Sequence, residues 1–170
     1  MAGAVSARSD EALGGRRTPP KARRPEPAPL ATSPLIEALS ADVRHRGVTA
    51  VEEFWADAGA SAPLVEHVPG HPRERIVTFV WRDAEAEEVL LFVNRLTDER
   101  QLADSLMRRL GDSDLWHLSY RMDSDWRASY SFLSRRRGER AAWRDAADQI
   151  ALRAALDRGH PDPRNPERWQ

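Results

Sequence analysis

Polar side chains with ligand-binding chemistry occupy alternate positions in two runs near the middle of the chain. His117, Ser119 and Arg121 alternate along the first run, and Arg127 and Ser129 along the second. Arginine donates planar hydrogen bonds that suit an anionic ligand. If the two runs lie side by side, His117, Arg121, Arg127 and Ser129 form one face that could bind such a ligand. The alternative is a solvated outer sheet face, which is the more common case.

The residues between these polar positions are apolar, and the alternation predicts how the two runs are placed. Successive side chains of a strand point to opposite faces. The apolar sets are Trp116, Leu118, Tyr120 and Met122 in the first run, and Trp126, Ala128, Tyr130 and Phe132 in the second. Asp123, Ser124 and Asp125 separate the runs with short polar side chains typical of turns. The pattern predicts an antiparallel hairpin over 115–133 with its apolar face buried.

No catalytic constellation is visible elsewhere in the sequence. The chain has no cysteine, which excludes disulfides, thiolate metal sites and cysteine nucleophiles. None of its serines lies in the G-x-S-x-G context of an α/β-hydrolase nucleophile, so no catalytic residue is assigned. His67 and His71 are separated by V-P-G, which is not a helical spacing that would aim two nitrogens at one metal ion. We therefore expect no metal and no cofactor.

Strands are predicted in the middle of the chain, before the aromatic runs. Short apolar runs and period-two alternation predict strands over 64–68, 75–81 and 89–93. The polar residues 82–88 are predicted to form a hairpin loop. The second and third strands are apolar on both faces, which is typical of strands beneath another layer. Together with the aromatic runs, these strands predict a mostly β fold, an antiparallel β-sandwich with N-terminal helices and a C-terminal helix.

Two helices are predicted at the start of the ordered body. Ser33 and the following proline are typical of a helix start, and Gly47 of its end. Thr49 and Glu52 then form the capping-box pattern ahead of a second helix. Residues 97–110 indicate a short helix or an ordered loop.

A long helix is predicted near the C-terminus, over 139–158. Its predicted core-facing side comprises Trp143, Ala147, Ile150, Ala151 and Ala154. Leu152 and Leu156 fall on the other side, so this helix could pack on two sides.

Composition limits the compartment and the classes of partner. A formal net charge of -1 gives no global attraction to nucleic acid or to an anionic membrane. No run of about 18 apolar residues predicts a membrane span, and the N-terminus lacks the apolar core of a signal peptide. Residues 1–33, rich in proline and arginine, are predicted to be a disordered tail. The simplest interpretation is a cytoplasmic protein without a nucleic-acid or membrane partner.

Several spaced motifs along the body resemble one protein family. They are VTFVWR at 77–82, VLLFVNRL at 89–96, MRRLGDSDLWHLSYRM at 107–122, DWRASYSF at 125–132 and DPRNPERW at 162–169. In this order they resemble the N-terminal domain of enterochelin (ferric enterobactin) esterases, over residues 34–169. The resemblance implies an immunoglobulin-like, early-set sandwich that precedes an α/β-hydrolase domain in intracellular enzymes. Those enzymes hydrolyse the triserine lactone of ferric catecholate siderophores.

In that family a DP-x-NP segment leads from the accessory domain into the catalytic domain. Asp162, Pro163, Asn165 and Pro166 match this segment, and the sequence ends shortly after it. The resemblance therefore implies a companion domain without the catalytic α/β-hydrolase domain. The implied parts are the tail over 1–33, the enterochelin-esterase-like domain over 34–160 and a linker-like end over 161–170.

The function that the resemblance implies is a non-catalytic accessory domain in iron acquisition. Such a domain would help to bind a ferric catecholate siderophore, or dock on a separately encoded α/β-hydrolase. Independent esterase activity is not expected, because no position matches the family's nucleophile motif.

Two alternatives stay open: a structural protein-interaction domain without a small ligand, and a carbohydrate-binding early-set domain, which needs an exposed aromatic platform. Buried Trp116 and Trp126 would count against sugar binding, whereas a concave polar face containing Arg121 and Arg127 would favour an anionic siderophore.

Overall fold

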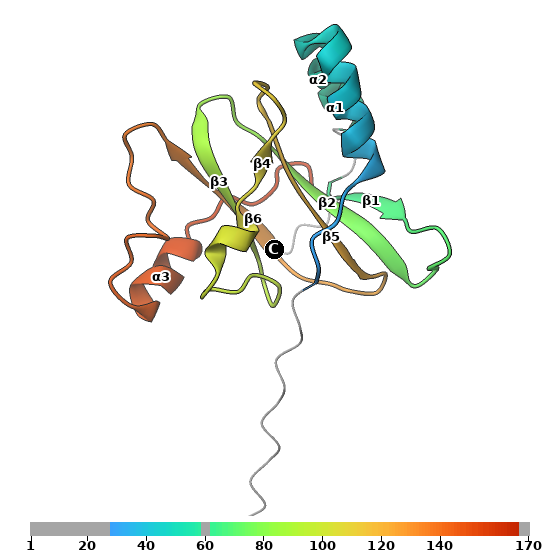
Figure 1. Cartoon of the computed structure of the whole chain (residues 1–170). Helices are drawn as coiled ribbons and strands as arrows, with labels where there is room; N and C mark the ends of the chain where they lie inside the picture. Colours follow the sequence, from blue (N-terminus) through green and yellow to red (C-terminus); the bar gives the residue numbers. More distant parts are fainter. Residues whose placement is uncertain (1–27, 59–61, 167–170) are drawn as a thin grey trace, which may run out of the picture.

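The computed structural model describes residues 28–58 and 62–166, which form two antiparallel sheets with helices on their outer sides (Figure 1). The helices are α1 (Pro34–Arg46), α2 (Val48–Ala58), the 3-10 helix η1 (Leu102–Ser105) and α3 (Gln149–Leu156). The strands are β1 (Leu64–His67), β2 (Glu74–Arg82), β3 (Ala86–Val93), β4 (Arg108–Arg109), β5 (Leu115–Asp123) and β6 (Tyr130–Arg136). The predicted mostly β, antiparallel class is confirmed. Among the described residues, no helix is long and apolar enough to cross a membrane.

The two sheets face each other across a shared apolar core. The larger sheet has the strand order β1-β2-β5-β4, and the smaller sheet pairs β3 with β6. Core residues from both sheets include Phe79, Leu118 and Tyr120 from the larger one, and Leu91 and Phe132 from the smaller one. As the alternation predicts, Trp116 is buried in this core, and Trp126 packs against it partly buried.

The predicted aromatic hairpin over 115–133 is wrong, because its two strands lie in different sheets. β5 pairs with β2 along its whole length, whereas β6 pairs with β3. The polar turn between the runs therefore crosses from one sheet to the other. The segment 82–88, also predicted as a hairpin loop, likewise connects β2 to β3 in the other sheet. Alternation determines only which side chains of a strand share a face. Two strands can bury their apolar faces as neighbours in one sheet or as members of two sheets that face each other, and the pattern is the same in both cases.

Helices cover the outer face of each sheet, so the molecule is layered (Figure 1). α1 and α2 cover the larger sheet, and α3 with the turns before it covers the smaller one. The apolar contacts of α1 and α2 with the larger sheet join Ile36, Leu39, Val51 and Trp55 to Leu64, Val80 and Leu115. Those on the smaller sheet join Trp143, Leu152 and Leu156 to Leu90 and Leu133.

Local signals determine where α1 begins and ends. Ser33 caps α1, because its hydroxyl accepts a hydrogen bond from the Ile36 N–H at 3.1 Å. Gly47 ends α1 with a φ of 65°, a left-handed conformation that favours glycine. α2 begins directly at Val48, so the predicted capping box at Thr49 lies inside the first turn of the helix.

The C-terminal helix is shorter than predicted, because residues 139–148 contain turns and no helix. Asp148 caps α3 by accepting a hydrogen bond from the Ala151 N–H at 2.8 Å. The buried side of α3 comprises Leu152, Ala155 and Leu156, whereas Ile150 is 81% exposed. The predicted core-facing side is therefore wrong. Trp143 is buried from a turn, so its position does not fix the phase of the helix.

The segment before α1 belongs to the ordered body, although it was predicted to be part of a disordered tail. The Ala31 N–H donates to the Ser119 carbonyl at 2.9 Å, and the Arg121 N–H donates to the Pro29 carbonyl at 2.9 Å. Residues 28–33 thus run alongside β5 and are hydrogen-bonded to its edge. The rest of the predicted tail lies outside the described residues.

Candidate functional site

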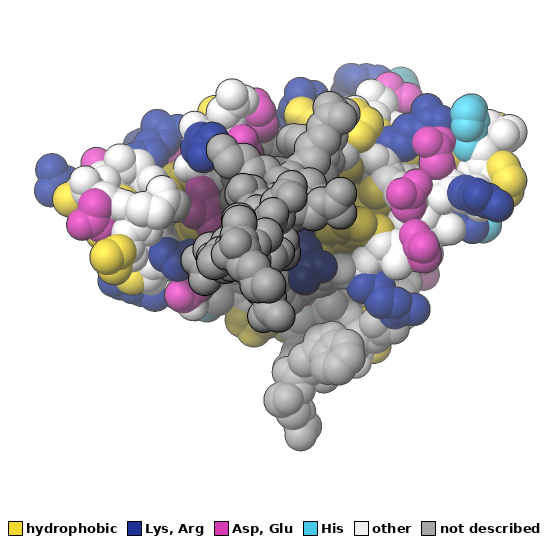
Figure 2. Space-filling model, turned by 90° about the horizontal axis from the view of Figure 1, so that it is seen from below, with side chains coloured by type: hydrophobic (Ala, Val, Ile, Leu, Met, Phe, Trp, Pro, Cys, Tyr) yellow, Lys and Arg dark blue, Asp and Glu magenta, His cyan; other side chains and the backbone are white. Residues whose placement is uncertain are grey.

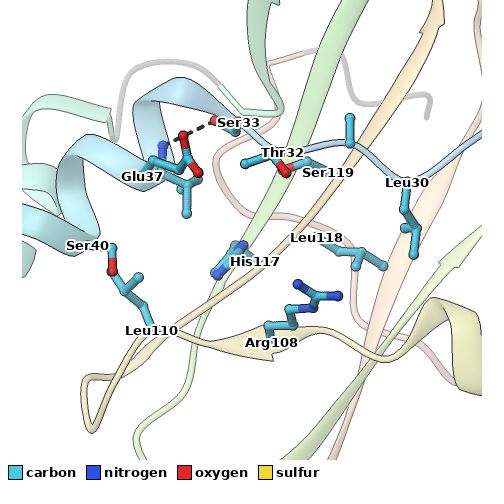
Figure 3. A pocket seen from close by; sticks show the side chains of 12 residues that line it. Leu30, Thr32, Ser33, Glu37, Ser40, Arg108, Leu110, His117, Leu118 and Ser119 are labelled. Atoms are coloured by element: carbon cyan, nitrogen blue, oxygen red, sulfur yellow. Dashed lines mark hydrogen bonds between the residues drawn. The ribbon is translucent and has the colours of Figure 1, made fainter.

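A pocket of about 330 Å³ lies on the outer face of the larger sheet (Figure 3). Residues 30–33 and α1 form one side, and β4 and β5 form the other. Its apolar lining consists of Leu30, Ala31, Ile36 and Leu110, together with Leu118, whose side chain belongs to the core between the sheets. Its polar lining consists of Thr32, Ser33, Glu37, Ser40, Arg108, His117 and Ser119. Such a lining suits a small ligand with an apolar body and a polar edge.

The register of β5 brings the polar walls together. His117 and Ser119 alternate with core residues and therefore point to the outer face. His117 lies opposite Arg108 of β4, and two to three residues along β5 the isolated bridge between Leu30 and Tyr120 attaches the segment before α1. The neighbouring strand β4 and the distant segment before α1 thus meet at one edge of β5.

His117 is half-buried and has no hydrogen-bond partner among the described residues. Burial, and then the nearby Arg108 guanidinium, lowers the pKa of His117 below its ordinary value of 6.5. The imidazole is therefore neutral at pH 7. A neutral imidazole presents one N–H donor and one acceptor nitrogen to a ligand.

Arg108 is exposed at the pocket and has no acceptor or carboxylate partner within the described part of the chain. The other arginines located in strands each have one, namely Arg75, Arg82, Arg109, Arg121, Arg135 and Arg136. Figure 2 shows basic and acidic side chains close together on the face seen from below. Glu37, across the pocket from Arg108 in Figure 3, also lacks a side-chain partner among these residues.

Ser119 and Arg121 are already engaged, unlike Arg108. The hydroxyl of Ser119 is buried and shares a 2.8 Å hydrogen bond with that of Thr78. Arg121 donates to the Glu74 carboxylate from Nε at 2.7 Å and also from Nη2. Arg121 does not line the pocket.

The single polar face predicted from His117, Arg121, Arg127 and Ser129 is wrong, because the neighbours of β5 are β2 and β4. Arg127 and Ser129 are exposed in the connection that leads to β6 in the other sheet. Of the four, only His117 lines the pocket. Ligand contact by any of the other three on its own stays a prediction.

The sequence patterns do not point to Arg108 or Glu37 as site residues. Arg108 falls in a stretch predicted as a short helix or loop, and Glu37 is simply an acidic residue in the first turn of α1. The remaining wall comes from residues 30–33, which were predicted to be a tail. No signal in the single sequence joins these segments.

The described part of the predicted linker-like end, residues 161–166, follows His160, which is attached to the body along β6. The backbones of His160 and Phe132 exchange hydrogen bonds of 2.8 and 2.9 Å. Gly159 allows this close approach, because a Cβ at this position would overlap the side chain of Ser131.

A second cluster, which we call the C-terminal clamp, consists of Trp55, Tyr130, Asp162 and Arg164. The buried carboxylate of Asp162 accepts hydrogen bonds from the Tyr130 hydroxyl at 3.1 Å and from the Arg164 backbone N–H at 2.9 Å. Burial, together with the Asp162 charge, raises the pKa of Tyr130, so the phenol stays protonated. The Arg164 guanidinium lies 4.2 Å from the centre of a Trp55 ring, and its Nη2 donates to the Val80 carbonyl at 3.2 Å.

Two other kinds of site are not seen in the described part of the chain. It holds no group of three histidine, aspartate or glutamate side chains placed to hold a metal ion. Its tryptophans are all buried or half-buried, namely Trp55, Trp81, Trp116, Trp126 and Trp143. The described residues therefore offer no exposed tryptophan platform of the kind that sugar-binding surfaces use.

The fold and the pocket define a small two-sheet domain with a polar pocket, and comparison with known proteins places it in a family. The family model described as "Enterochelin esterase, N-terminal" matches residues 76–170, more than half of the chain. The chain belongs to this family.

Two curated relatives show how much of a longer protein this chain resembles. An iron(III) salmochelin esterase from Escherichia coli O6:H1 is 36% identical over 118 residues, which cover 66% of this chain and 27% of the relative. An iron(III) enterobactin esterase from Dickeya dadantii is 36% identical over 90 residues, which cover 48% of this chain and 20% of the relative. The chain thus spans about a quarter of the length of these relatives.

Among solved structures, an enterobactin esterase from Shigella flexneri matches with a TM-score of 0.48 and 23% identity. The match covers 68% of this chain and 30% of that one.

Proposed function

We propose that this chain is a non-catalytic accessory domain that helps an α/β-hydrolase of the enterochelin esterase type to bind its ferric catecholate siderophore. The observation that carries the proposal is the family match over 76–170. This range contains most of β2, all of β3 to β6 and α3, and therefore most of both sheets and the Arg108 and His117 walls of the pocket. The named relatives are esterases of iron(III) enterobactin and iron(III) salmochelin.

The chemistry of the pocket supports a binding role without catalysis. Arg108 offers an unpaired cation, and neutral His117 offers a donor and an acceptor. The serine beside them on β5, Ser119, is buried and bonded to Thr78, and it lies within a regular strand. An esterase nucleophile instead sits exposed on a sharp strand-to-helix turn.

The same proposal includes an immunoglobulin-like, early-set sandwich that acts in the cytoplasm. Two antiparallel sheets that face each other, with connections crossing between them, support this type of fold. The absence of cysteine suits a reducing compartment.

Isothermal titration tests the proposed function. The full chain is titrated with preformed ferric enterobactin, and separately with the catalytic domain of an enterochelin esterase, first without and then with the ferric ligand. We expect heat from the ferric ligand, from the hydrolase, or from the two together. Ferric nitrilotriacetate is the control for iron alone. An absence of heat in every combination would overturn the proposal.

A second candidate is an interaction domain that docks on the hydrolase without touching the siderophore. The attached segment 160–166 favours it, because β6 and the clamp hold the part of the chain that matches the family's interdomain motif. In the same titrations, this candidate predicts heat from the hydrolase and none from the ferric ligand.

A further inference from the structure

The unpaired polar groups of the pocket come from three separate walls. Arg108 comes from β4, His117 from β5 and Glu37 from α1. Within the described part of the chain, none of these side chains has a hydrogen bond or a carboxylate partner. Figure 3 shows them around one hollow. A cation, a neutral imidazole and a carboxylate together match a ligand with adjacent donors and acceptors on one edge.

The size of the pocket limits what can enter it. Its volume of about 330 Å³ is at the lower end of the range for small-molecule sites, roughly 300–1,000 Å³. The apolar lining from Leu30, Ile36 and Leu110 suits one aromatic ring. A complete ferric siderophore, with three aromatic arms around one metal ion, is too large for this space.

Whether iron is bound decides which edge of a catechol ring can face the polar walls. We call one catechol-bearing unit of the siderophore an arm. In a ferric complex both oxygens of each catecholate point to the metal, so the arm presents its C–H edge outwards. That edge would leave Arg108, His117 and Glu37 without partners, at a cost in free energy. An iron-free arm instead presents two adjacent hydroxyl groups, which can accept from Arg108, donate to His117 and donate to Glu37.

We propose that this pocket binds a single iron-free catechol arm, a 2,3-dihydroxybenzoyl group, with its hydroxyl edge against Arg108, His117 and Glu37. The inference rests on the proposed function, which supplies the catechol class of ligand. The inference adds that the domain binds the iron-free form of the arm, which exists before iron is bound or after iron is released. The ferric complex then contacts the domain outside this pocket.

Isothermal titration of the full chain with 2,3-dihydroxybenzamide tests the inference. This amide carries the arm without a carboxylate. Binding should be seen for wild type and should weaken about tenfold or more in Arg108→Gln, which removes a charged donor. Glu37→Gln should weaken binding less, because the amide oxygen can still accept a hydrogen bond. Benzamide, which lacks both hydroxyls, should bind much more weakly than 2,3-dihydroxybenzamide.

Arg100→Gln is the matched control, because Arg100 is an exposed arginine that does not line the pocket. It should bind 2,3-dihydroxybenzamide as wild type does. Arg108 is exposed and unpaired, so its variant is expected to fold, and circular dichroism checks this. Equal affinity of Arg108→Gln and wild type, equal binding of benzamide, or a loss in Arg100→Gln alone would each overturn the inference.

Parallel titrations with ferric enterobactin separate this inference from the proposed function. If the ferric complex binds and 2,3-dihydroxybenzamide does not, the pocket assignment fails and the accessory function stands. If 2,3-dihydroxybenzamide binds through Arg108 while neither the ferric complex nor the hydrolase gives heat, the pocket assignment stands and the accessory function fails. If Arg108→Gln weakens the ferric complex as much as the free arm, the claim of selectivity for the iron-free arm is overturned.

Discussion

Arg164 in the C-terminal clamp and Arg108 in the pocket belong to two clusters of similar chemistry. Each cluster combines an arginine, a carboxylate and an aromatic or imidazole ring. In the clamp Arg164 lies over Trp55, donates to a backbone carbonyl and faces Asp162 at 3.5 Å. In the pocket Arg108 has no acceptor among the described residues, although Glu37 lines the same hollow.

The difference between the two clusters follows from burial. The side chain of Asp162 is 1% exposed and that of Arg164 is 16% exposed, so each charge needs a partner to offset its lost hydration. Arg108 and Glu37 are exposed, and water solvates them without any protein partner. Paired groups of this kind hold a segment in place, whereas unpaired groups beside a hollow are free to bind a ligand.

The largest effect is expected from breaking the clamp at Asp162. Asp162→Ala leaves the Arg164 guanidinium without its carboxylate and removes the acceptor of the Tyr130 hydroxyl. Removing one partner of a buried charge pair costs about 3 kcal/mol or more, so we expect the free energy of unfolding to fall by about that amount. Urea unfolding followed by tryptophan fluorescence measures it.

Asp112→Ala is the control for this measurement, because Asp112 is an exposed aspartate in the turn after β4. It should change the free energy of unfolding by less than about 0.5 kcal/mol. A cost of Asp162→Ala no larger than that of Asp112→Ala would contradict the view that the clamp holds the C-terminal segment.

A direct comparison of the two arginines should give a smaller effect. Arg164→Ala removes the contact with Trp55 and the hydrogen bond to the Val80 carbonyl. The Asp162 carboxylate keeps its hydrogen bonds from Tyr130 and from the backbone N–H of residue 164, so the free energy of unfolding should fall by only about 1–2 kcal/mol. Arg108→Ala should change it by less than about 0.5 kcal/mol, because no described contact is lost. The same urea experiment measures both variants. The opposite order of stabilities would show that the roles assigned to the two clusters are wrong.

Some of the fold could be predicted from the sequence because the signals are local. Ser33 and Gly47 determine the ends of α1 through capping and a positive φ, which depend on a few neighbouring residues. The alternation that buries Trp116, Leu118 and Tyr120 is also local, since it follows from the pleat of β5.

Strand pairing and the phase of α3 could not be predicted in this way. β5 and β6 bury the same apolar faces whether they pair or face each other, so the pattern of Trp116 to Phe132 does not distinguish the two arrangements. Trp143 is buried, but it lies in a turn before the helix. Counting the helical phase from Trp143 therefore placed Ile150 in the core, although Ile150 is exposed.

The pocket could not be predicted from the sequence for a similar reason, because its walls come from separate segments that only the folded chain brings together. Of its polar residues, His117 could be found from the outer face of β5. Arg108 and Glu37 reach it through the pairing of β4 with β5 and through the bridge that attaches Leu30 to Tyr120. A single sequence carries no signal for either contact.

The smallest expected effect is the pH dependence that His117 gives to stability. Burial, and then Arg108, lowers the pKa of His117 in the folded protein below 6.5, the value expected in the unfolded chain. As the pH falls below about 6.5, the unfolded chain therefore takes up a proton that the folded protein resists, and the free energy of unfolding declines. Above that pH the two states are both neutral at this residue, and the difference disappears.

His117→Gln removes this titration and isolates its contribution. The difference in the free energy of unfolding between wild type and His117→Gln should fall from pH 7.5 to pH 5.5, as measured by urea unfolding at both values. The other titratable groups are the same in both proteins, so their effects largely cancel in the difference. In an Arg108→Gln background the fall should be smaller but still present, because burial is the larger cause of the lowered pKa. A pH-independent difference would mean that His117 is solvated as freely as in the unfolded chain, and that the pocket is not the half-buried hollow on which a ligand's hydroxyl edge could rely.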